Sequence, residues 1–370
     1  MSSFGENLSE LLEKYEHEFD SKKSQLISSL QPFYQHDLDC FSSPPKNYRM
    51  RAEFRVWHEG DKTFHIMFDQ ATKTRFQVDQ LDVACSLINQ AMFQVMKYIN
   101  LSQILRTKLF QIDYLAATTG QIVISMIYHK PLTDDWTENV STMLSKIEGF
   151  TKVNIIGRSK KQKVVLGNDY VIEKFEIKGK QYTFKQIENS FTQPNAIINE
   201  KMISWAIDNS IHHASDLLEL YCGAGNFSIP LSNYYRNVLG TEISKTSVNA
   251  AQYNIAENTV DNLNIARLSS EEFVQAFNGV RKFNRLANID LLNYKFKTVL
   301  VDPPRSGLDD KTLELVSSFD QIIYISCNPN TLVENLSTLC KTHEISKAAF
   351  FDQFPFTPHI EAGVVLNKIT

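Results

Sequence analysis

The second half of the chain alternates short apolar runs with stretches of helical periodicity, and this alternation restricts the fold more than any other feature. From about residue 189 onward the apolar runs read DLLELY, NVLGTE, LNIAR, KTVLVD and QIIYIS. Strands that alternate with helices in this way form a doubly wound, mostly parallel sheet with helices on both faces. Ligands bind such a sheet at the carboxyl ends of its strands. The residues that end or follow each run are therefore the candidates for a functional site.

The preceding segment has a different pattern. Between residues 45 and 185, apolar and polar residues alternate about Gly60 and Gly120, as they do in β-hairpins, and one helical stretch covers about residues 81–98. We expect a helical segment at 1–40, an α+β domain rich in hairpins at 41–185, and an α/β domain at 186–370. The first segment opens with an amphipathic helix. The apolar side of that helix is predicted to carry Leu8, Leu11, Leu12, Tyr15 and Phe19.

The charge of the chain is unevenly distributed. The sum of 38 basic and 42 acidic residues, a net charge of −4, does not by itself indicate a nucleic-acid-binding protein. Residues 1–40, however, hold eight acidic and three basic residues, while Lys152–Lys185 hold nine basic and three acidic. The RSKKQK stretch in that segment is a candidate strip for binding phosphates. The aromatic residues among the basic residues of 46–75 are candidates either for stacking on bases or for the core: Tyr48, Phe54, Trp57 and Phe64.

Metal, disulfide and membrane sites are not expected. The five cysteines form no C-x-x-C pair, which excludes the usual disulfide frameworks, zinc sites and iron–sulfur clusters. The His212-His213 pair also lacks the spacing of a metal site. No apolar run approaches the ~18 residues that a membrane span requires, and the N-terminal residues are acidic. The sequence therefore predicts a cytoplasmic protein without membrane attachment.

The first apolar run leads into a glycine loop, ELYCGAGNFS. Gly223 and Gly225 let the backbone approach a ligand, and a helix is expected to begin directly after them. Glu242 ends the next run, where a carboxylate can accept both hydroxyls of a ribose. This spacing suits NAD and S-adenosylmethionine alike, but Ser228 stands where a dinucleotide site prefers a third glycine. The pattern favours S-adenosylmethionine over NAD, with a purely structural turn as the alternative.

Two later runs also end in polar residues. Asp302 precedes Pro303 and Pro304, whose rings fix φ and remove hydrogen-bond donors, so its carboxylate should be a rigid acceptor. Cys327 directly follows QIIYIS, just before a helical stretch that starts near Thr331. A helix N-terminus favours a thiolate, so we expect the pKa of Cys327 to lie below ~8.5. A buried and inert cysteine is the alternative.

The motifs DPPRSG (302–307), SCNP (326–329) and T-x-H-x-E (357–361) occur together with RMRAEFR, LFQIDYL and ENSFTQPN. With these motifs the chain resembles the tRNA (uracil-5-)-methyltransferase family over nearly its whole length. The resemblance implies a Rossmann-type methyltransferase domain that follows an RNA-binding α+β domain. It also implies that Cys327 is the nucleophile and that Glu361 is the proton acceptor. The implied contacts to S-adenosylmethionine are Gln193, Tyr221, Asn226, Glu242 and Asp302.

The residue types suit the implied reaction. Uracil C5 is a weak nucleophile, so a thiolate must first add to C6, and a base must later remove the C5 proton. We expect methyl transfer from S-adenosylmethionine to C5 of the uridine at position 54 in the tRNA T-loop, giving 5-methyluridine. Asp302 is expected to contact both the methyl donor and the uracil edge. Arg305, or a backbone N–H, is expected to stabilise the negative charge that develops at O4.

Other substrates and roles remain open at this point. The alternatives are the same reaction on ribosomal RNA, the same reaction on another RNA with a T-like arm such as tmRNA, and a tRNA-folding chaperone in which methylation is secondary. Relatives that act on ribosomal RNA often carry a cysteine cluster for an iron–sulfur centre and an extra N-terminal β-barrel. The sequence shows neither feature, which favours tRNA. No obligate protein partner is expected.

Overall fold

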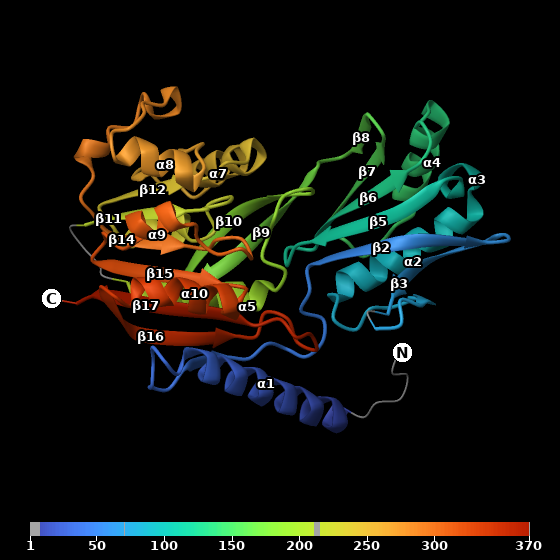
Figure 1. The fold of residues 1–370 in the computed structure, drawn as a ribbon. Coiled ribbons are helices and arrows are strands. Elements are labelled where there is room, and N and C mark those ends of the chain that lie inside the picture. The colour runs from blue at the N-terminus through green and yellow to red at the C-terminus, as the bar shows by residue number, and fades with distance from the viewer. Residues whose placement is uncertain (1–7, 70, 211–214, 370) are drawn as a thin grey trace. The chain divides into compact units, whose positions relative to one another are not determined.

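A computed structural model describes residues 8–69, 71–210 and 215–369 (Figure 1). The chain divides into two compact units, which are described separately below. The first unit consists mainly of Pro44–Lys174 and Gln186–Ala196. The second unit consists of Ser9–Ser43, Phe175–Lys185 and Ile197–Thr370.

The second unit is built on an eight-stranded sheet with the order β1-β16-β17-β15-β14-β11-β12-β13. All neighbouring strands in it are parallel, except that β17 is antiparallel to both β15 and β16. The five predicted apolar runs form the five strands β11 to β15, so the predicted α/β fold class is confirmed. The bounds of the strands are β1 (Asp39–Phe41), β11 (Asp216–Leu220), β12 (Asn237–Thr241), β13 (Leu263–Ala266), β14 (Phe296–Val301), β15 (Gln321–Ser326), β16 (His343–Phe351) and β17 (Glu361–Lys368).

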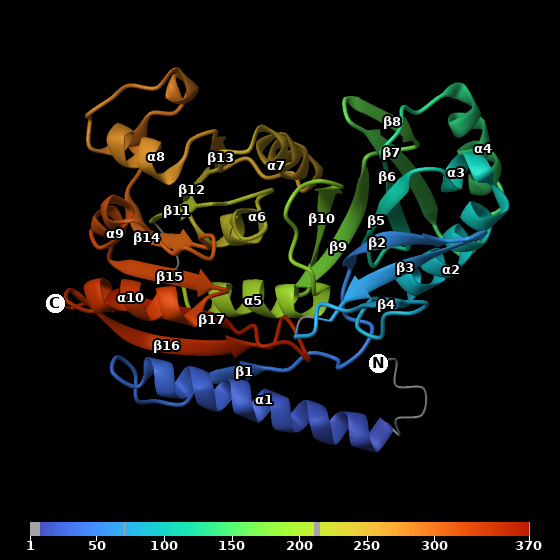
Figure 2. The ribbon, with the colours of Figure 1, turned by 45° about the vertical axis from the view of Figure 1, so that its right-hand side comes forward.

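Helices cover this sheet and bury its strands (Figure 2). Every residue of β11 and of β15 is buried, as expected for central parallel strands that are covered on both faces. The core includes Leu218, Val299 and Ile322 from the sheet, packed together with Leu332 and Leu336 from α10. The helices of this unit are α5 (Ala196–Asp208), α6 (Ser228–Leu231), η1 (Ser232–Tyr234), α7 (Lys245–Glu257), α8 (Ser270–Phe277), η2 (Asn284–Leu286), η3 (Leu291–Asn293), α9 (Asp310–Val316) and α10 (Pro329–Leu339).

The N-terminal helix α1 (Leu8–Leu30) packs on the second unit through a stripe that differs from the predicted one. Its buried residues are Leu11, Tyr15, Lys22, Leu26 and Leu30. Leu8 and Leu12 are 67% and 40% exposed, so the predicted apolar side was wrong at these two positions. The observed stripe advances by four or seven residues, which keeps it on one side of a helix with 3.6 residues per turn.

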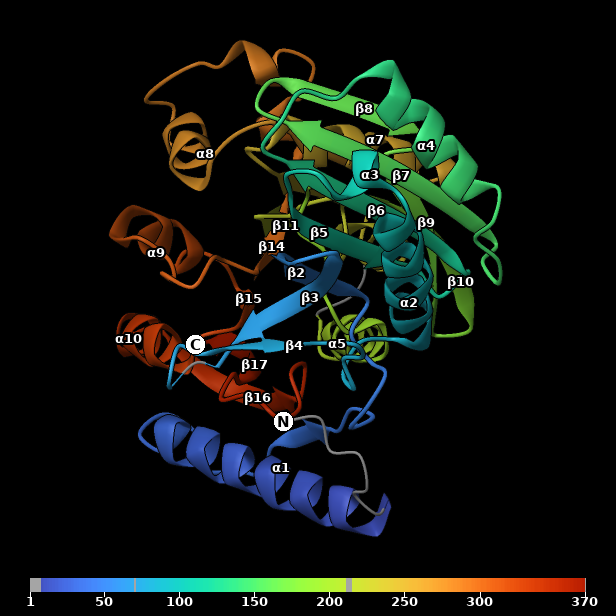
Figure 3. The ribbon, with the colours of Figure 1, turned by 90° about the vertical axis from the view of Figure 1, so that its right-hand side faces the viewer.

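The first unit contains a seven-stranded sheet with the order β4-β3-β2-β5-β6-β7-β8. The predicted hairpins are present: β2 and β3 pair about Gly60, and β5 and β6 pair about Gly120. The helices α2 and α4 lie against one face of this sheet (Figure 3) and form a core with alternate residues of β2. The elements are β2 (Arg51–Glu59), β3 (Lys62–Phe68), β4 (Arg75–Gln77), α2 (Ser86–Leu101), α3 (Gln103–Arg106), β5 (Leu109–Ala116), β6 (Gln121–Tyr128), α4 (Asp134–Leu144), β7 (Lys152–Ser159) and β8 (Gln162–Leu166). A separate hairpin pairs β9 (Tyr170–Ile177) with β10 (Lys180–Ile187).

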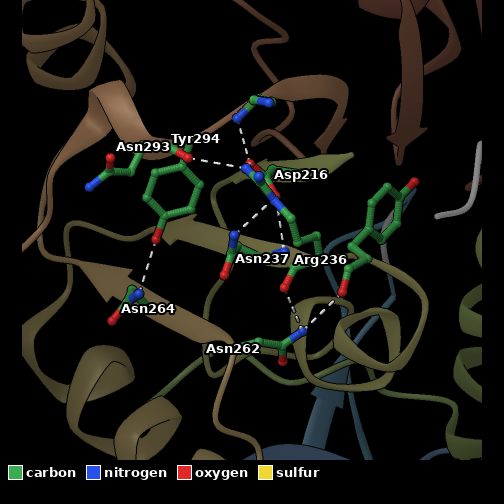
Figure 4. A network of polar contacts seen from close by, with 9 residues as sticks. Asp216, Arg236, Asn237, Asn262, Asn264, Asn293 and Tyr294 are labelled. Carbon is green, nitrogen blue, oxygen red and sulfur yellow. Dashed lines mark hydrogen bonds and ion pairs between the residues drawn. The ribbon is translucent and has the colours of Figure 1, made fainter. Parts of the chain in front are cut away.

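A buried carboxylate ties together the starts of three strands in the second unit (Figure 4). Asp216 is fully buried, and its oxygens accept hydrogen bonds from Arg236 Nε at 2.9 Å, Arg236 Nη2 at 2.5 Å and the Lys295 N–H at 2.5 Å. The Asn237 N–H donates a further bond at 3.0 Å. Burial alone would raise the pKa of Asp216, but these hydrogen bonds outweigh it and lower the pKa.

We expect Asp216→Asn to lower the free energy of unfolding at pH 7 by about 3 kcal/mol, because Arg236 loses its buried anionic partner. Urea unfolding measures this loss. The wild-type advantage should be complete above the ordinary Asp pKa of ~3.9 and should disappear as pH falls through the lower native pKa. The matched control is Asp320→Asn, which removes an exposed ion pair with Lys297 (2.5 Å) and should cost less than about 1 kcal/mol. Equal losses in the two variants would contradict the assignment.

Candidate active site

The predicted residues of the second unit gather at one edge of its sheet. Tyr221, Glu242, Asp302 and Cys327 directly follow β11, β12, β14 and β15. These four strands are parallel neighbours, so their carboxyl ends meet at the same edge. Glu361 reaches this edge in a different way, because it is the first residue of the antiparallel strand β17.

The register of β15 and β17 relates the two expected catalytic residues. Ser326 pairs with Ala362. In an antiparallel pair the next position along one strand faces the previous position along the other, so Cys327 and Glu361 lie opposite each other. The structure thus brings together a thiol and a carboxylate that are 34 positions apart in the sequence.

The glycine loop after β11 begins with a residue in a strained backbone conformation. Tyr221 has φ +62°, a conformation that a bulky residue rarely adopts and that is found mainly at functional sites. Its hydroxyl donates a hydrogen bond to Ser270 Oγ at 2.8 Å, at the start of α8. Gly223 and Gly225 have φ +56° and +85°. A Cβ added at Gly223 would meet nothing within 4 Å, so a ligand can approach the backbone there.

Glu242 links this loop to the next strand. Its Oε2 accepts the Gly223 N–H at 3.1 Å, and its Oε1 accepts the Ser244 N–H at 2.6 Å. Each carboxylate oxygen has a second lone pair that can accept a ribose hydroxyl. An open glycine backbone beside such a carboxylate fits an adenosyl group. The helix that we expected after the loop is short, since α6 has only four residues. Its dipole contributes correspondingly little, and the loop and the carboxylate must do most of the binding.

The two remaining predicted cofactor residues have different surroundings. The Asn226 side chain exchanges two hydrogen bonds with Asn199 of α5, both at 2.8 Å, and this exchange fixes the end of the glycine loop. Gln193 belongs to the first unit, in the segment Gln186–Ala196. It is not among the residues that the strand ends bring together, and its contact with the cofactor stays a prediction.

The Asp-Pro-Pro loop is fastened to the loop that carries Cys327. The Arg305 carbonyl accepts hydrogen bonds from Asn328 Nδ2 at 2.8 Å and from Thr331 Oγ1 at 3.3 Å. Asn328 also caps α10, because its side chain accepts the Asn330 N–H. These contacts hold the segments after β14 and β15 in a fixed relation.

Asn335 of α10 holds the segment that follows the Asp-Pro-Pro motif. Sequence reasoning missed this residue. Its Oδ1 accepts the Leu308 N–H at 2.9 Å and the Tyr324 hydroxyl at 2.8 Å. A Cβ added at Gly307, which has φ +73°, would lie only 2.9 Å from this oxygen. The available signal was a polar residue within the apolar stripe of α10, which otherwise consists of Leu332, Leu336 and Leu339.

The environment of Cys327 contradicts the expected low pKa. Burial raises the pKa of the thiol to about 11, helped by the negative charges of Glu361 and Asp302, while Arg305 partly offsets them. The thiol is therefore protonated at neutral pH and needs a proton acceptor before it can act as a nucleophile.

Glu361 is 3% exposed and occupies the apolar setting that the sequence predicted. Burial raises its pKa well above the ordinary value, the charge of Asp302 raises it further, and Arg305 partly offsets this. Burial also raises the pKa of Asp302. Arg305 Nη2 lies 3.4 Å from His359 Nε2 at the edge of the site. Arg305 therefore acts electrostatically on Glu361, and the raised pKa values of Glu361 and Asp302 make both carboxylates stronger proton acceptors when they are ionised.

The remaining cysteines lack such a setting, and all five are free thiols. Cys222 is a buried residue of the glycine loop itself, and burial raises its pKa. Within the described residues, no group of three His, Cys, Asp or Glu side chains could hold a metal ion. His212 and His213 lie outside the described residues. Among the helices that the structure describes, none has the length and apolar composition of a membrane span.

The first unit carries an aromatic and basic hollow on the sheet face away from α2 and α4. The rings of Phe110 and His129 stack with centroids 3.9 Å apart, and the Arg55 guanidinium lies 5.3 Å from the Phe110 centroid. The hollow is also lined by Arg158 and by residues of the RSKKQK stretch, among them Lys160. Sequence reasoning missed Phe110 and His129, although FQIDYL and MIYH each place an aromatic ring on this side of an alternating strand.

The aromatic residues that we had considered for stacking have mixed positions. Tyr48 and Phe54 are 2% and 1% exposed, so they belong to the core and cannot stack on a base. Trp57 is 36% exposed, but the Arg75 guanidinium lies over its ring at 3.8 Å. Phe64 is half-buried.

The strand order, the glycine loop with its acidic partner and the polar strand ends define a Rossmann-like methyltransferase. Comparison with known proteins specifies the family. The sequence model for tRNA (Uracil-5-)-methyltransferase matches residues 14–369, and the chain belongs to this family.

Curated relatives match along nearly the whole chain. The tRNA/tmRNA (uracil-C(5))-methyltransferase of Pseudoalteromonas atlantica is 52% identical over 354 residues, covering 96% of this chain and 97% of the relative. The protein of the same name from Haemophilus influenzae is 52% identical over 360 residues, covering 96% and 99%. Among solved structures, the Pyrococcus abyssi tRNA (uracil-54, C5)-methyltransferase in complex with S-adenosyl-L-homocysteine superposes with a TM-score of 0.72 at 20% identity. That match covers 95% of this chain and 83% of the other, and it supports the fold.

Proposed function

We propose that this methyltransferase transfers a methyl group from S-adenosylmethionine to C5 of the uridine at position 54 in the tRNA T-loop. The observation that carries this proposal is the register of β15 and β17. Continued one position beyond Ser326 and Ala362, this register places Cys327 opposite Glu361, and Asp302 is close enough to act on the pKa of both. When bound, S-adenosylmethionine supplies an electrophilic methyl group. The residues that would hold it are Tyr221, Asn226, Glu242 and Asp302, with Gln193 as a further predicted contact.

The chain's own residues account for each change of bonding on the uracil. The Cys327 proton passes to the Asp302 carboxylate, so Glu361 stays unprotonated for the later step. Sγ bonds to C6 as the C5=C6 double bond opens to an enolate, which makes C5 electron-rich. C5 then bonds to the methyl carbon while the bond from that carbon to the donor sulfur breaks, and S-adenosylhomocysteine leaves with the electron pair of that bond. Glu361 removes the proton from C5, and the Sγ–C6 bond breaks to release 5-methyluridine and the free thiolate. Arg305 is exposed beside this site and is the candidate to stabilise negative charge at O4.

The substrate proposal is supported by the relatives, whose names give tRNA and tmRNA. We infer that tmRNA, which has a T-like arm, is a second substrate, and that the protein acts in the cytoplasm where these RNAs are found. A base within a folded loop must leave its stack to reach the site. We assign binding of the RNA around the target base to the first unit. The predicted division of the chain into segments 1–40, 41–185 and 186–370 stays a prediction.

Incubation with S-adenosylmethionine carrying a labelled methyl group, followed by mapping of the labelled nucleotide, tests this function. The RNAs to compare are a tRNA transcript, the same transcript with U54 replaced by C, tmRNA and ribosomal RNA. We expect label at C5 of U54 in tRNA and none after the replacement. Label that appears only in ribosomal RNA would overturn the substrate assignment.

The basic turn between β7 and β8 should contribute to RNA affinity. Lys160 and Lys161 are both exposed there. Replacing both with Gln should weaken tRNA binding about tenfold at moderate salt and reduce the slope of log affinity against log salt by about 1 to 2. Filter binding at several salt concentrations measures both quantities. The control removes two exposed lysines from the opposite, helical side of the same unit, Lys97→Gln with Lys146→Gln, and should change the slope less. Equal changes would show a nonspecific charge effect.

A further inference from the structure

The N-terminal helix α1 contacts the loop that carries most of the T-x-H-x-E motif. This loop, residues 352–360, joins β16 to β17, and Glu361 directly follows it. Phe351 pairs with Glu361 at the base of the loop. Pairing with β16 therefore fixes the backbone of Glu361. The conformation of the loop determines the direction in which the chain reaches Glu361 from its N-terminal side.

Two charged residues of α1 make the contacts to this loop. Lys22 Nζ donates to Asp352 Oδ1 at 3.1 Å and to the Phe354 carbonyl at 2.8 Å. Glu18 Oε1 lies 2.8 Å from Lys22 Nζ, and Glu18 Oε2 accepts the Phe356 N–H at 2.7 Å. One helix thus holds three positions of the loop: the side chain of Asp352 and the backbone of Phe354 and of Phe356.

The held backbone includes a strained residue. Phe356 has φ +59°, which is unfavourable for a bulky side chain and persists only where surrounding contacts impose it. The bond from its N–H to Glu18 is one such contact. Packing of the Phe356 ring edge-on to Tyr15 of α1, with centroids 6.1 Å apart, is another.

Docking of α1 does not by itself require a charge at position 22. Leu11, Leu26 and Leu30 already bury the apolar stripe of the helix, and Lys22 is only 5% exposed within that stripe. Burying an ammonium group is costly unless it is fully compensated, and an apolar residue of similar volume often stabilises as well or better. The ammonium group at position 22 is explained by its two hydrogen bonds to the loop, one to the Asp352 carboxylate and one to the Phe354 carbonyl.

We propose that Lys22 and Glu18 are positioning residues for the proton-removal step: they fix the 352–360 loop and thereby aim the Glu361 carboxylate at uracil C5. This inference rests on the proposed role of Glu361. Cys327 lies at the end of β15 and does not depend on the loop for its position. Loss of the contacts that Lys22 and Glu18 make with the loop should therefore slow proton removal more than formation of the Cys327–RNA bond.

The test separates these two steps in the full-length enzyme. With 5-fluorouridine in the tRNA, C5 carries no proton to remove, so the rate of adduct formation reports addition and methyl transfer alone. With ordinary tRNA, release of tritium from [5-³H]uridine reports proton removal. For Lys22→Met we expect adduct formation within about twofold of wild type, tritium release slowed at least about tenfold, and a covalent protein–RNA species that accumulates during turnover.

Two further variants complete the experiment. Lys23→Met, the neighbouring position on the same helix, should leave both rates unchanged, and Lys22→Arg should recover tritium release because it keeps the charge. If Lys22→Met does not fold, Glu18→Ala is used instead, since Glu18 is 22% exposed and its loss leaves the Lys22–Asp352 pair. A parallel fall of both rates, or no change in either, overturns the inference. Failure of the wild-type enzyme to form any adduct would instead overturn the proposed function.

Discussion

The Cys327→Ala variant is expected to transfer no methyl group to tRNA, a loss on the order of 10⁴-fold or more, because addition to C6 has no substitute nucleophile in the site. It should also form no covalent adduct with tRNA that contains 5-fluorouridine. Binding of tRNA should remain close to wild type, since the thiol contributes little surface. Denaturing gels measure the adduct, and transfer of labelled methyl groups measures turnover.

A second cysteine variant provides the control for this experiment. Cys340 is also half-buried with a pKa raised to about 11, but it lies at the far end of α10, where it forms the C-cap. Cys340→Ala should keep full methyl transfer and full adduct formation. Residual turnover in Cys327→Ala, with its tRNA binding intact, would refute the assignment of Cys327 as the nucleophile.

The Glu361→Gln variant is expected to stall after methyl transfer. Glutamine keeps the shape of the side chain but cannot accept the C5 proton, so release of 5-methyluridine should slow by about 10²- to 10⁴-fold. The covalent enzyme–RNA species should then accumulate with ordinary tRNA. Addition itself should not be impaired by electrostatics, because removal of the Glu361 charge lowers the pKa of Cys327.

The proton-removal step can be followed by quenching single turnovers and separating covalent from free RNA. Glu344→Gln serves as the control, because Glu344 is exposed on β16 of the same hairpin. It should release product at the wild-type rate. Rapid release of methylated tRNA by Glu361→Gln would exclude Glu361 as the base and would point to another acceptor, with Asp302 the first to examine.

The sequence was sufficient for features that depend on local patterns. Runs such as QIIYIS are apolar throughout, and β15 is indeed buried at every residue, because a central parallel strand is covered on both faces. Because Asp302 and Cys327 each follow a predicted parallel strand, the sequence alone predicted that both lie at the same edge of the sheet. The position of Glu361 followed from the family motif, since nothing local indicates that β17 runs antiparallel between β15 and β16.

Features that depend on long-range contacts were predicted poorly. Burial and two carboxylates that follow or begin other strands raise the pKa of Cys327, and the local sequence around Cys327 shows neither. Lys22 reads as a solvated charge on an amphipathic helix, yet it is buried against a loop 330 positions away. Asn335 stands out in the sequence as a polar residue within an apolar stripe, but that pattern does not show that it bonds to Leu308 and Tyr324.

The pairing of β1 with β16 has a consequence for synthesis of the protein. Asp39 pairs with Ala349, so the first strand of the second unit pairs with a strand 310 positions later, and the chain between them includes Pro44–Lys174 of the first unit. At about 5 to 20 residues per second, the ribosome needs roughly 15 to 60 seconds to make β16 after β1 has emerged. During that interval the apolar stripe of α1 has no sheet to cover. The growing chain therefore carries an uncovered helix while its middle folds, and it should be a client of chaperones that bind apolar segments of nascent proteins.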